Sequence, residues 1–366
     1  MAADKAGKGA GYIRHIMINI AIIGMGQRGR ATRDRLRFVE SINVVVECDT
    51  DRDWRQVVRL AEVDLVWICT PWEWHATMAV EAMKAGKDVA LEVPAVLTIG
   101  ECHTMVRVAR ETHRHCIILE NCCYDTWHLG IVEMVRQGLF GRIKHLEGAY
   151  AHTVPDGWMR NQGRRHAGNP YPTHALGPMC QLLPEGDSLD YIVSLSSQIP
   201  GDHTNTSLIR TRCGVSMLLH YDISTPRPYN RMQTVCGVLG YAQKYPTPTL
   251  QIQSEGSNPR TIALMGDEAV QYVESHISPK YRAMIDKGRQ LGVSHVMNYM
   301  MDLRIAEVME RVLANRKDGL EEPSFDMDVY DAALWSSVVE LSEQSVLRGL
   351  IPVKFPEFGE QGGYPR

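Results

Sequence analysis

The sequence predicts an α/β protein in which a doubly wound parallel sheet is followed by an α+β domain with a mostly antiparallel open sheet. Apolar runs alternate with helical patterns over residues 16 to 125, and strand-like runs with short turns follow from residue 143. The chain of 366 residues is also longer than a single hydrophobic core usually supports. We therefore expect two domains, residues 1–125 and 126–366, with the C-terminal helices packing back.

The N-terminal part carries five apolar runs that are typical of buried strands. These runs are IMINIAII (16–23), INVVVECD (42–49), DLVWICTP (64–71), DVALEVP (88–94) and CIILEN (116–121). Helical patterns such as HATMAVEAMKAGK separate them. Continuous apolar strands between helices indicate a parallel sheet that is covered on both faces.

The C-terminal part begins after a helix that ends near Gly138 and Gly141. Strand-like runs then follow closely: IKHLEGAYA (143–151), LDYIVSLSS (189–197), TNTSLIRT (204–211), GVSMLLHYD (214–222) and MQTVCGVLG (232–240). Consecutive strands with short turns indicate an antiparallel or mixed sheet. Helical patterns at about 294–315 and 327–348 close the chain.

A glycine motif, Gly24-x-Gly26-x-x-Gly29, lies between the first strand and a helical pattern. There the first glycine permits a tight turn, the second lets a pyrophosphate approach the backbone, and the helix N-terminus stabilises its charge. Asp49 ends the second strand, where a carboxylate can bind both ribose hydroxyls and repel a 2′-phosphate. We therefore expect a Rossmann domain that binds NAD in preference to NADP.

Polar and aromatic side chains follow the third, fourth and fifth strands. Residues 72–75 and 92–94 should emerge at the carboxyl edge of the sheet, where ligands of open α/β sheets bind. The string LENCCYD brings Asn121 and Tyr124 to the same edge. These positions are candidates for binding a ligand.

A second cluster, GNPYPTHALGP, places Tyr171 and His174 at a predicted helix start, where Pro172 suits the first turn. Phenol and imidazole groups can transfer protons, and donors at a helix start favour an anionic or electron-rich ligand. A purely structural histidine is the alternative for His174.

Composition argues against several classes of function. The 39 basic and 43 acidic residues give a net charge of −4 without a polybasic run, which argues against nucleic acid or membrane partners. Nine cysteines without a CxxC pair indicate reduced thiols, and Cys122, Cys123 and His115 lack zinc-ligand spacing, so no metal is expected. No export signal or membrane span is visible, so we expect a cytoplasmic protein, with export of a processed form left open.

Six strings occur in a fixed order: CTPWEWH, EVPA, ENCCYD, YPTHALGP, PRPYNR and DMDVYDAALW. Together they resemble glycoside hydrolase family 109, the NAD-dependent α-N-acetylgalactosaminidases of the Gfo/Idh/MocA oxidoreductase superfamily. The resemblance runs from about residue 16 to the C-terminus. It implies a Gfo/Idh/MocA-like fold, NAD as the cofactor and a carbohydrate substrate.

The resemblance also implies roles for single residues. Beside the glycines, the family's NAD-contacting positions match Gln27, Arg28, Asp49, Trp72, Glu73, Trp74, His75, Glu92, Val93 and Asn121. Its substrate-contacting positions match Tyr150, Arg160, Tyr171, Pro172, Thr173, His174 and Tyr229. The residues credited with proton transfer match Tyr124 and His174.

The family's mechanism is a hydrolysis through transient oxidation. A hydride leaves C3 of the sugar for NAD⁺, a base removes the acidified C2 proton, the C1 substituent is eliminated, water adds and the hydride returns. The resemblance implies that Tyr124 faces C2 and that His174 serves the C3 hydroxyl. We expect both groups to converge on one sugar.

Two alternatives remain open. A conventional NAD-dependent sugar dehydrogenase would oxidise a ring hydroxyl and release NADH, but Val93 stands where such an enzyme would carry the lysine of a Glu-Lys-Pro triplet. A non-catalytic NAD-binding protein is the third hypothesis, because GVSHVMNY at 292–299 replaces a glycine-rich segment of the family. We also expect a homo-oligomer, since an open sheet has a face to cover.

Overall fold

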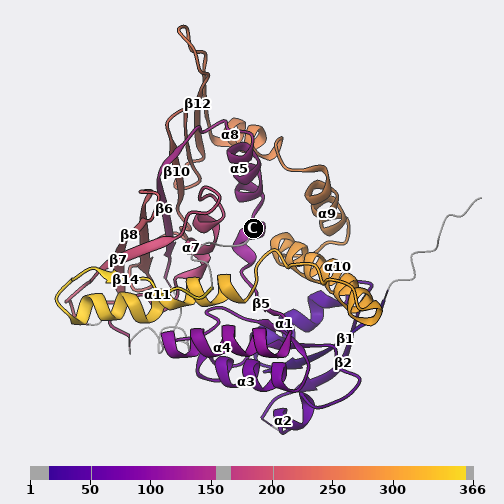
Figure 1. Ribbon diagram of the computed structural model, residues 1–366. Coiled ribbons are helices and arrows are strands. Elements are labelled where there is room, and N and C mark those ends of the chain that lie inside the picture. The colour runs from indigo at the N-terminus through magenta and orange to yellow at the C-terminus, as the bar shows by residue number, and fades with distance from the viewer. Residues whose placement is uncertain (1–15, 51, 154–165, 201, 360–366) are drawn as a thin grey trace, which may run out of the picture.

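The structure is a computed structural model that describes residues 16–50, 52–153, 166–200 and 202–359 (Figure 1). Its N-terminal sheet is parallel, with the strand order β2-β1-β3-β4-β5. The strands are β1 (Ile18–Ile23), β2 (Ile42–Cys48), β3 (Leu65–Ile68), β4 (Asp88–Leu91) and β5 (Cys116–Ile118). The predicted parallel sheet is thereby confirmed, and each strand lies within one of the five apolar runs.

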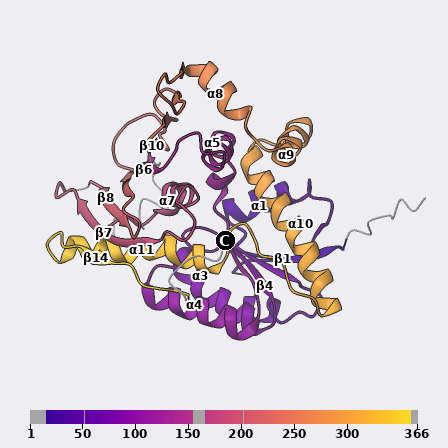
Figure 2. The ribbon, with the colours of Figure 1, turned by 45° about the horizontal axis from the view of Figure 1, so that its top comes forward.

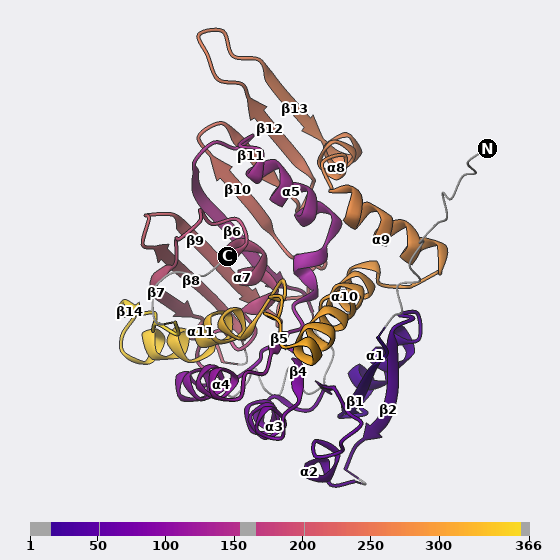
Figure 3. The ribbon, with the colours of Figure 1, turned by 45° about the vertical axis from the view of Figure 1, so that its right-hand side comes forward.

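Helices cover both faces of this sheet, which explains why β3, β4 and β5 are buried along their whole length. Figure 3 shows α3 and α4 on one side and α1 on the other. A capping box of Thr98 and Glu101 fixes the start of α4, because each side chain bonds the backbone of the other. The helices are α1 (Gln27–Leu36), α2 (Trp54–Val57), α3 (Trp72–Lys84) and α4 (Ile99–Thr112).

The C-terminal sheet has nine strands in the order β13-β12-β11-β10-β6-β9-β8-β7-β14. Only the central pair β6 and β9 is parallel among the paired strands described, so the sheet is mostly antiparallel, as expected. The strands are β6 (Ile143–Ala151), β7 (Leu189–Ser196), β8 (Thr204–Thr211), β9 (Ser216–Asp222), β10 (Gln233–Gly237), β11 (Gly240–Gln243), β12 (Thr249–Gln253), β13 (Thr261–Met265) and β14 (Val353–Lys354).

Helices α5, α7 and α11 pack against one face of this sheet (Figures 2 and 3). Gly148 of β6 permits the close approach of α7, because a Cβ atom there would lie 3.0 Å from side-chain atoms of Ala175 and Met179. The remaining elements are η1 (Asn121–Tyr124), α5 (Thr126–Arg136), α7 (Thr173–Cys180), α8 (Gly266–Glu274), α9 (Pro279–Gln290), α10 (Val296–Asp318) and α11 (Val329–Leu347).

The two C-terminal helices pack back onto the N-terminal domain. Helix α10 contacts α1 and β1, and a buried ion pair between Arg35 and Asp302 joins it to α1. At its other end Arg316 donates to the buried carboxylate of Asp88 at 2.7 Å. Helix α11 contacts α4 and β5. A domain division at residue 125, between η1 and α5, remains our proposal.

Residues 240–290 form β11 to β13, α8 and α9, a region for which the apolar runs carried no prediction. Leu195 and Leu208, on neighbouring strands β7 and β8, are each 56% exposed. Such apolar groups on an open sheet fit the predicted self-association, which stays a prediction. Within the described residues, no helix is both long and apolar enough to cross a membrane.

Candidate active site

The glycine turn between β1 and α1 has the shape that a dinucleotide requires. Gly24 has a φ of +95°, and a Cβ atom there would lie 2.7 Å from the carbonyl carbon of Cys69. A Cβ atom on Gly29 would lie 2.0 Å from the carbonyl oxygen of Gly24, whereas one on Gly26 would meet no described atom within 4 Å. Helix α1 begins at Gln27 without a side-chain cap among these described residues. The open space and uncapped amides therefore suit a pyrophosphate.

A cavity of about 1310 Å³ extends from this turn across the edge of the sheet. Its lining includes six of the predicted cofactor residues: Gly24, Gly26, Gln27, Arg28, Asp49 and Trp74. Residues 292–295, which precede α10, and Asn298 of its first turn form part of the wall. The cavity is thus lined by residues of both domains, which the sequence did not predict.

Other predicted cofactor residues support the edge without lining this cavity. His75 is fully buried, and its ring nitrogens lie 2.9 Å from the carbonyl oxygens of Thr70 and Pro94. Burial lowers the pKa of His75, against the effect of these carbonyls. Val93 is also buried, whereas Glu73 is exposed. His75 therefore holds the β3–α3 loop to the end of β4.

The remaining cofactor candidates connect the cavity to neighbouring elements. Arg28 lies 3.5 Å from Glu92, which raises the pKa of the arginine. Trp72 is buried and stacks on Tyr171, with ring centroids 5.7 Å apart. Asn121 donates a hydrogen bond to Asn298 of α10.

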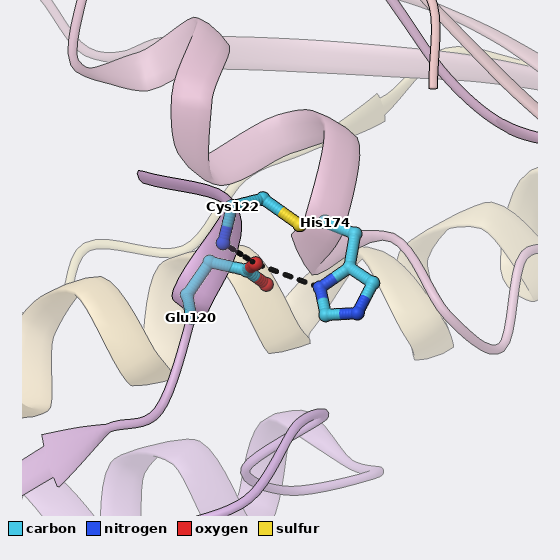
Figure 4. A group of neighbouring side chains, drawn as sticks. All are labelled: Glu120, Cys122 and His174. Carbon is cyan, nitrogen blue, oxygen red and sulfur yellow. Dashed lines mark hydrogen bonds and ion pairs between the residues drawn. The ribbon is translucent and has the colours of Figure 1, made fainter. Parts of the chain in front are cut away.

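His174, which is partly buried, pairs with the fully buried Glu120 (Figure 4). Its Nδ1 lies 2.7 Å from Oε1 of Glu120, which also accepts from the backbone N–H of Cys122 at 3.1 Å. Burial opposes ionisation of Glu120, but His174 and these hydrogen bonds lower its pKa overall. The carboxylate therefore holds a proton on Nδ1 and leaves Nε2 for chemistry.

Two tyrosines adjoin the ring of His174. The hydroxyl of Tyr171 lies 3.1 Å from Nε2 of His174, and the rings of Tyr150 and His174 have centroids 5.6 Å apart. The two tyrosine rings are 4.9 Å apart. Burial raises the pKa of both phenols, that of Tyr150 to about 12. We call Trp72, Tyr150, Tyr171 and His174 the aromatic cluster.

No hydrogen bond or ring contact joins Tyr124 to His174 among the described residues, so their expected convergence on one sugar stays a prediction. Its hydroxyl donates to Oδ2 of Asp326 at 2.9 Å, and its ring packs edge-on against Tyr281. Asp326 in turn binds Arg304 at 2.6 Å. Burial and the adjacent carboxylate raise the pKa of Tyr124 well above its usual range. The described geometry therefore brings Tyr171 and Tyr150 to His174 in place of Tyr124.

The other predicted substrate residues fall near this cluster. Pro172 caps the N-terminus of α7 and Thr173 is its first, fully buried residue. Tyr229 is 45% exposed, and its ring centroid lies 5.0 Å from that of His152. Arg160 lies outside the described residues. Glu120 was not among the predicted site residues, although its position directly after the buried fifth strand was a signal for it.

Glu120, Cys122 and His174 have potential ligand atoms within 4.8 Å of one another. Glu120 and His174 are already bonded to each other, and the guanidinium of Arg231 contacts the thiol of Cys122. These contacts support a hydrogen-bonded acid–base pair better than a metal centre. Neither Cys122 nor Cys123 takes part in a disulfide among the described residues.

Two family models match separate parts of the chain. Residues 30–119 match the family described as "Oxidoreductase family, NAD-binding Rossmann fold". Residues 199–364 match "Glycosyl hydrolase 109, C-terminal domain". The N-terminal domain is thus an NAD-binding Rossmann domain, and NAD is the cofactor.

Solved structures agree in fold. An NAD binding oxidoreductase from Klebsiella pneumoniae matches with a TM-score of 0.73 and 16% identity, covering 93% of this chain and 99% of that one. An inositol dehydrogenase homolog from Azotobacter vinelandii, complexed with NADH and myo-inositol, matches with a TM-score of 0.69 and 17% identity, over 93% and 98% of the two chains. At these identities the likeness concerns the Gfo/Idh/MocA fold alone.

Curated relatives are considerably closer in sequence. The chain is 36% identical to glycosyl hydrolase family 109 protein 2 of Phocaeicola vulgatus, over 93% of this chain and 94% of the relative. It is 37% identical to an alpha-N-acetylgalactosaminidase of Bacteroides fragilis, over 93% and 92%. Similarity of this extent spans both domains, so the chain is an NAD-binding enzyme that belongs to glycosyl hydrolase family 109.

Proposed function

We propose that this enzyme hydrolyses terminal α-linked N-acetylgalactosaminides by transient oxidation of the sugar. Its family membership supports a glycosidase that uses NAD. The observation that carries the finer proposal is the Glu120–His174 pair next to the aromatic cluster, whose Tyr150 and Tyr171 lie within electrostatic reach of Arg28 in the cofactor cavity. An acid–base pair next to a redox cofactor suits proton removal that accompanies hydride transfer.

The residues that would hold NAD follow from the cavity. Gly26 and the first turn of α1 would hold the pyrophosphate, and Asp49 would bind the adenosine ribose. When bound, NAD supplies a reversible hydride acceptor, which would keep the sugar as a 3-ketone for part of each cycle. Val93, buried and apolar, offers no ammonium group of the kind expected in a sugar dehydrogenase.

His174 would accept the proton of the C3 hydroxyl and later return it. With Nδ1–H donated to Glu120, its Nε2 carries the lone pair and can accept that proton, and the carboxylate stabilises the imidazolium that forms. The adjacent Tyr171 hydroxyl would orient the sugar toward Nε2. Returning the same proton completes the cycle.

The ketone makes the C2 proton acidic and turns the C1 substituent into a leaving group by elimination. Water then adds at C1 before C3 is reduced again. This route requires no pair of carboxylates flanking the glycosidic bond, unlike most glycosidases. Tyr150, Tyr171 and Tyr229 would form the wall against which the pyranose lies, since aromatic rings cover the apolar face of a sugar.

The test uses the purified protein and an aryl α-N-acetylgalactosaminide, without added cofactor. We expect release of the phenol, no net NADH absorbance, and deuterium at C2 of the product when the solvent is D₂O. An aryl α-N-acetylglucosaminide serves as the comparison for configuration. Stoichiometric NADH with free sugars and an intact glycoside would instead show a dehydrogenase and overturn the proposal.

A further inference from the structure

A second phenol–imidazole pair lies at the end of β6, next to the aromatic cluster. The hydroxyl of Tyr150 lies 2.9 Å from Nε2 of His152, and the two rings meet edge-on with centroids 4.9 Å apart. The family resemblance assigns no role to His152. The pair is distinct from the Glu120–His174 pair, although Tyr150 touches both imidazoles.

Backbone contacts fix the proton position on His152. Its Nδ1 lies 3.1 Å from the carbonyl oxygen of Thr153, which can only accept, so Nδ1 carries the proton. Thr153 is itself held, because its hydroxyl donates to the carbonyl of Thr225 at 3.1 Å and accepts from the backbone N–H of Arg227 at 3.3 Å. The lone pair therefore lies on Nε2, 2.9 Å from the hydroxyl of Tyr150, which can donate its hydrogen to it.

Burial disfavours the phenolate form of Tyr150, so this residue needs a proton acceptor such as His152 if it is to act as a base. Its side chain is 8% exposed, and burial raises its pKa to about 12. Burial lowers the pKa of the half-buried His152, with His174 and Arg231 acting in the same direction, so this ring is neutral. A neutral imidazole with a free lone pair can accept the phenol's proton as the phenol takes up another.

We infer that His152 is a positioning residue that receives the hydroxyl proton of Tyr150 while the Tyr150 oxygen removes the C2 proton of the oxidised sugar. This inference rests on the proposed function, in which NAD⁺ is the hydride acceptor that creates the 3-ketone. The electron pair of the C2–H bond forms the C1–C2 double bond as the C1–O bond breaks. The leaving oxygen takes that bond's electrons and gains a proton from water.

The two pairs thereby divide the proton transfers between them. Glu120 and His174 act on the C3 hydroxyl, whereas Tyr150 and His152 act on C2. Separate pairs are useful because the C3 proton must be held while the C2 proton is removed. Tyr150 also lies within electrostatic reach of Arg28, which lines the cofactor cavity.

The experiment compares His152→Phe, Tyr150→Phe and the double variant. Phenylalanine keeps a ring against Tyr150 but has no nitrogen. In D₂O, with N-acetylgalactosamine and the NAD that copurifies, we expect His152→Phe to slow C2 exchange by about a hundredfold while transient NADH formation changes less than threefold. The double variant should be no slower than Tyr150→Phe, since residues that act as one unit are not additive.

The matched control is His145→Phe, on the same strand, where the histidine bonds Ser216 at 2.8 Å and lies outside the proposed site. It should leave exchange unchanged. Wild-type exchange in His152→Phe, or a double variant whose loss is the product of the single losses, would overturn the role of His152 alone. A wild-type protein that neither exchanges nor hydrolyses would overturn the proposed function and this inference with it.

A second measurement does not depend on activity. Nitrogen-15 NMR of the histidine side chains, with His152 assigned by comparison with His152→Phe, should show a neutral ring protonated on Nδ1. A ring protonated on Nε2 would overturn the inference even in an active enzyme, because Nε2 could then accept nothing from Tyr150.

Discussion

Glu120 and His174 are 54 positions apart in the chain, yet Oε1 of the carboxylate and Nδ1 of the imidazole lie 2.7 Å apart. The contact joins the end of β5 to the first turn of α7, so one element from each domain supplies half of the pair. Any change in how the two domains meet would therefore act directly on this pair.

Replacement of Glu120 by Gln should slow hydrolysis at least tenfold. The amide keeps the size and an acceptor oxygen but removes the charge that stabilises the imidazolium of His174. The acidic limb of the kcat/KM profile should move to lower pH for the same reason. Glu147→Gln, which alters a partner of His145 on β6, is the control. An unchanged profile in Glu120→Gln would contradict the assigned role.

Gly26→Ala should lower NAD content, whereas Gly29→Ala should lower thermal stability. A Cβ atom at Gly26 enters open space, so the fold should persist while NAD content falls sharply, because the methyl group occupies the pyrophosphate position. At Gly29 the Cβ atom would lie 2.0 Å from the carbonyl oxygen of Gly24, so the melting temperature should fall. NAD content by absorbance and thermal melting distinguish the two. Equal NAD content in Gly26→Ala and wild type would refute this interpretation of the turn.

Tyr124→Phe should keep C2 exchange but lose stability. The variant removes a hydrogen bond of 2.9 Å to Asp326, which keeps its ion pair with Arg304, so a loss of about 1 to 3 kcal/mol is expected. Tyr171→Phe should instead slow hydrolysis, since its hydroxyl lies at Nε2 of His174. Urea unfolding and deuterium exchange measure both effects. Abolished exchange in a folded Tyr124→Phe would restore Tyr124 as the base.

His128 should make the protein less stable in mild acid. Burial lowers its pKa to about 4 from an ordinary 6.5, and Gln181 and Gln233 bond the neutral ring. The unfolded chain binds this proton below about pH 6.5 and the folded chain only near 4, so stability is lost as pH falls through that window. The loss is about 3 kcal/mol. The difference in unfolding free energy between wild type and His128→Gln should shift by this amount from pH 7 to 4; a constant difference would contradict it.

Removing one charge of the Arg35–Asp302 ion pair should lower the free energy of unfolding strongly, whereas replacing both residues by apolar ones should lower it much less. Both side chains are buried, so Asp302→Asn leaves an unpaired guanidinium and should cost about 3 to 5 kcal/mol. The double variant Arg35→Met with Asp302→Leu should recover most of this loss, because no charge then remains buried. Denaturant unfolding of the three proteins tests the prediction. A double variant as unstable as Asp302→Asn would show that the charges themselves are required.

The sequence was informative where function depends on neighbours along the chain. The turn from Gly24 to Gly29 is a local structure whose spacing carries its meaning, and the apolar runs of the parallel sheet are continuous because both faces are buried. The helices α10 and α11 were likewise visible as long periodic patterns. These features need no knowledge of distant contacts.

Contacts between distant residues could not be predicted in the same way. Tyr124 was placed at the correct sheet edge, but the direction of its hydroxyl is set by Asp326, 202 positions away. The partners of His174 and His152 depend on how α7 and β6 pack, which no periodicity records. The short strands β11 to β13 also escaped prediction, because brief polar strands at the far edge of a sheet carry a weak pattern.

The part of the cavity wall formed by residues 292–295 and Asn298 has a kinetic consequence. Movement of α10 away from α1, which would widen the cavity, would also separate the buried opposite charges of Arg35 and Asp302. Departure should therefore be much slower than catalytic turnover. We therefore expect one cofactor molecule to stay bound through many turnovers and to be reoxidised in place, when its hydride returns to the keto sugar.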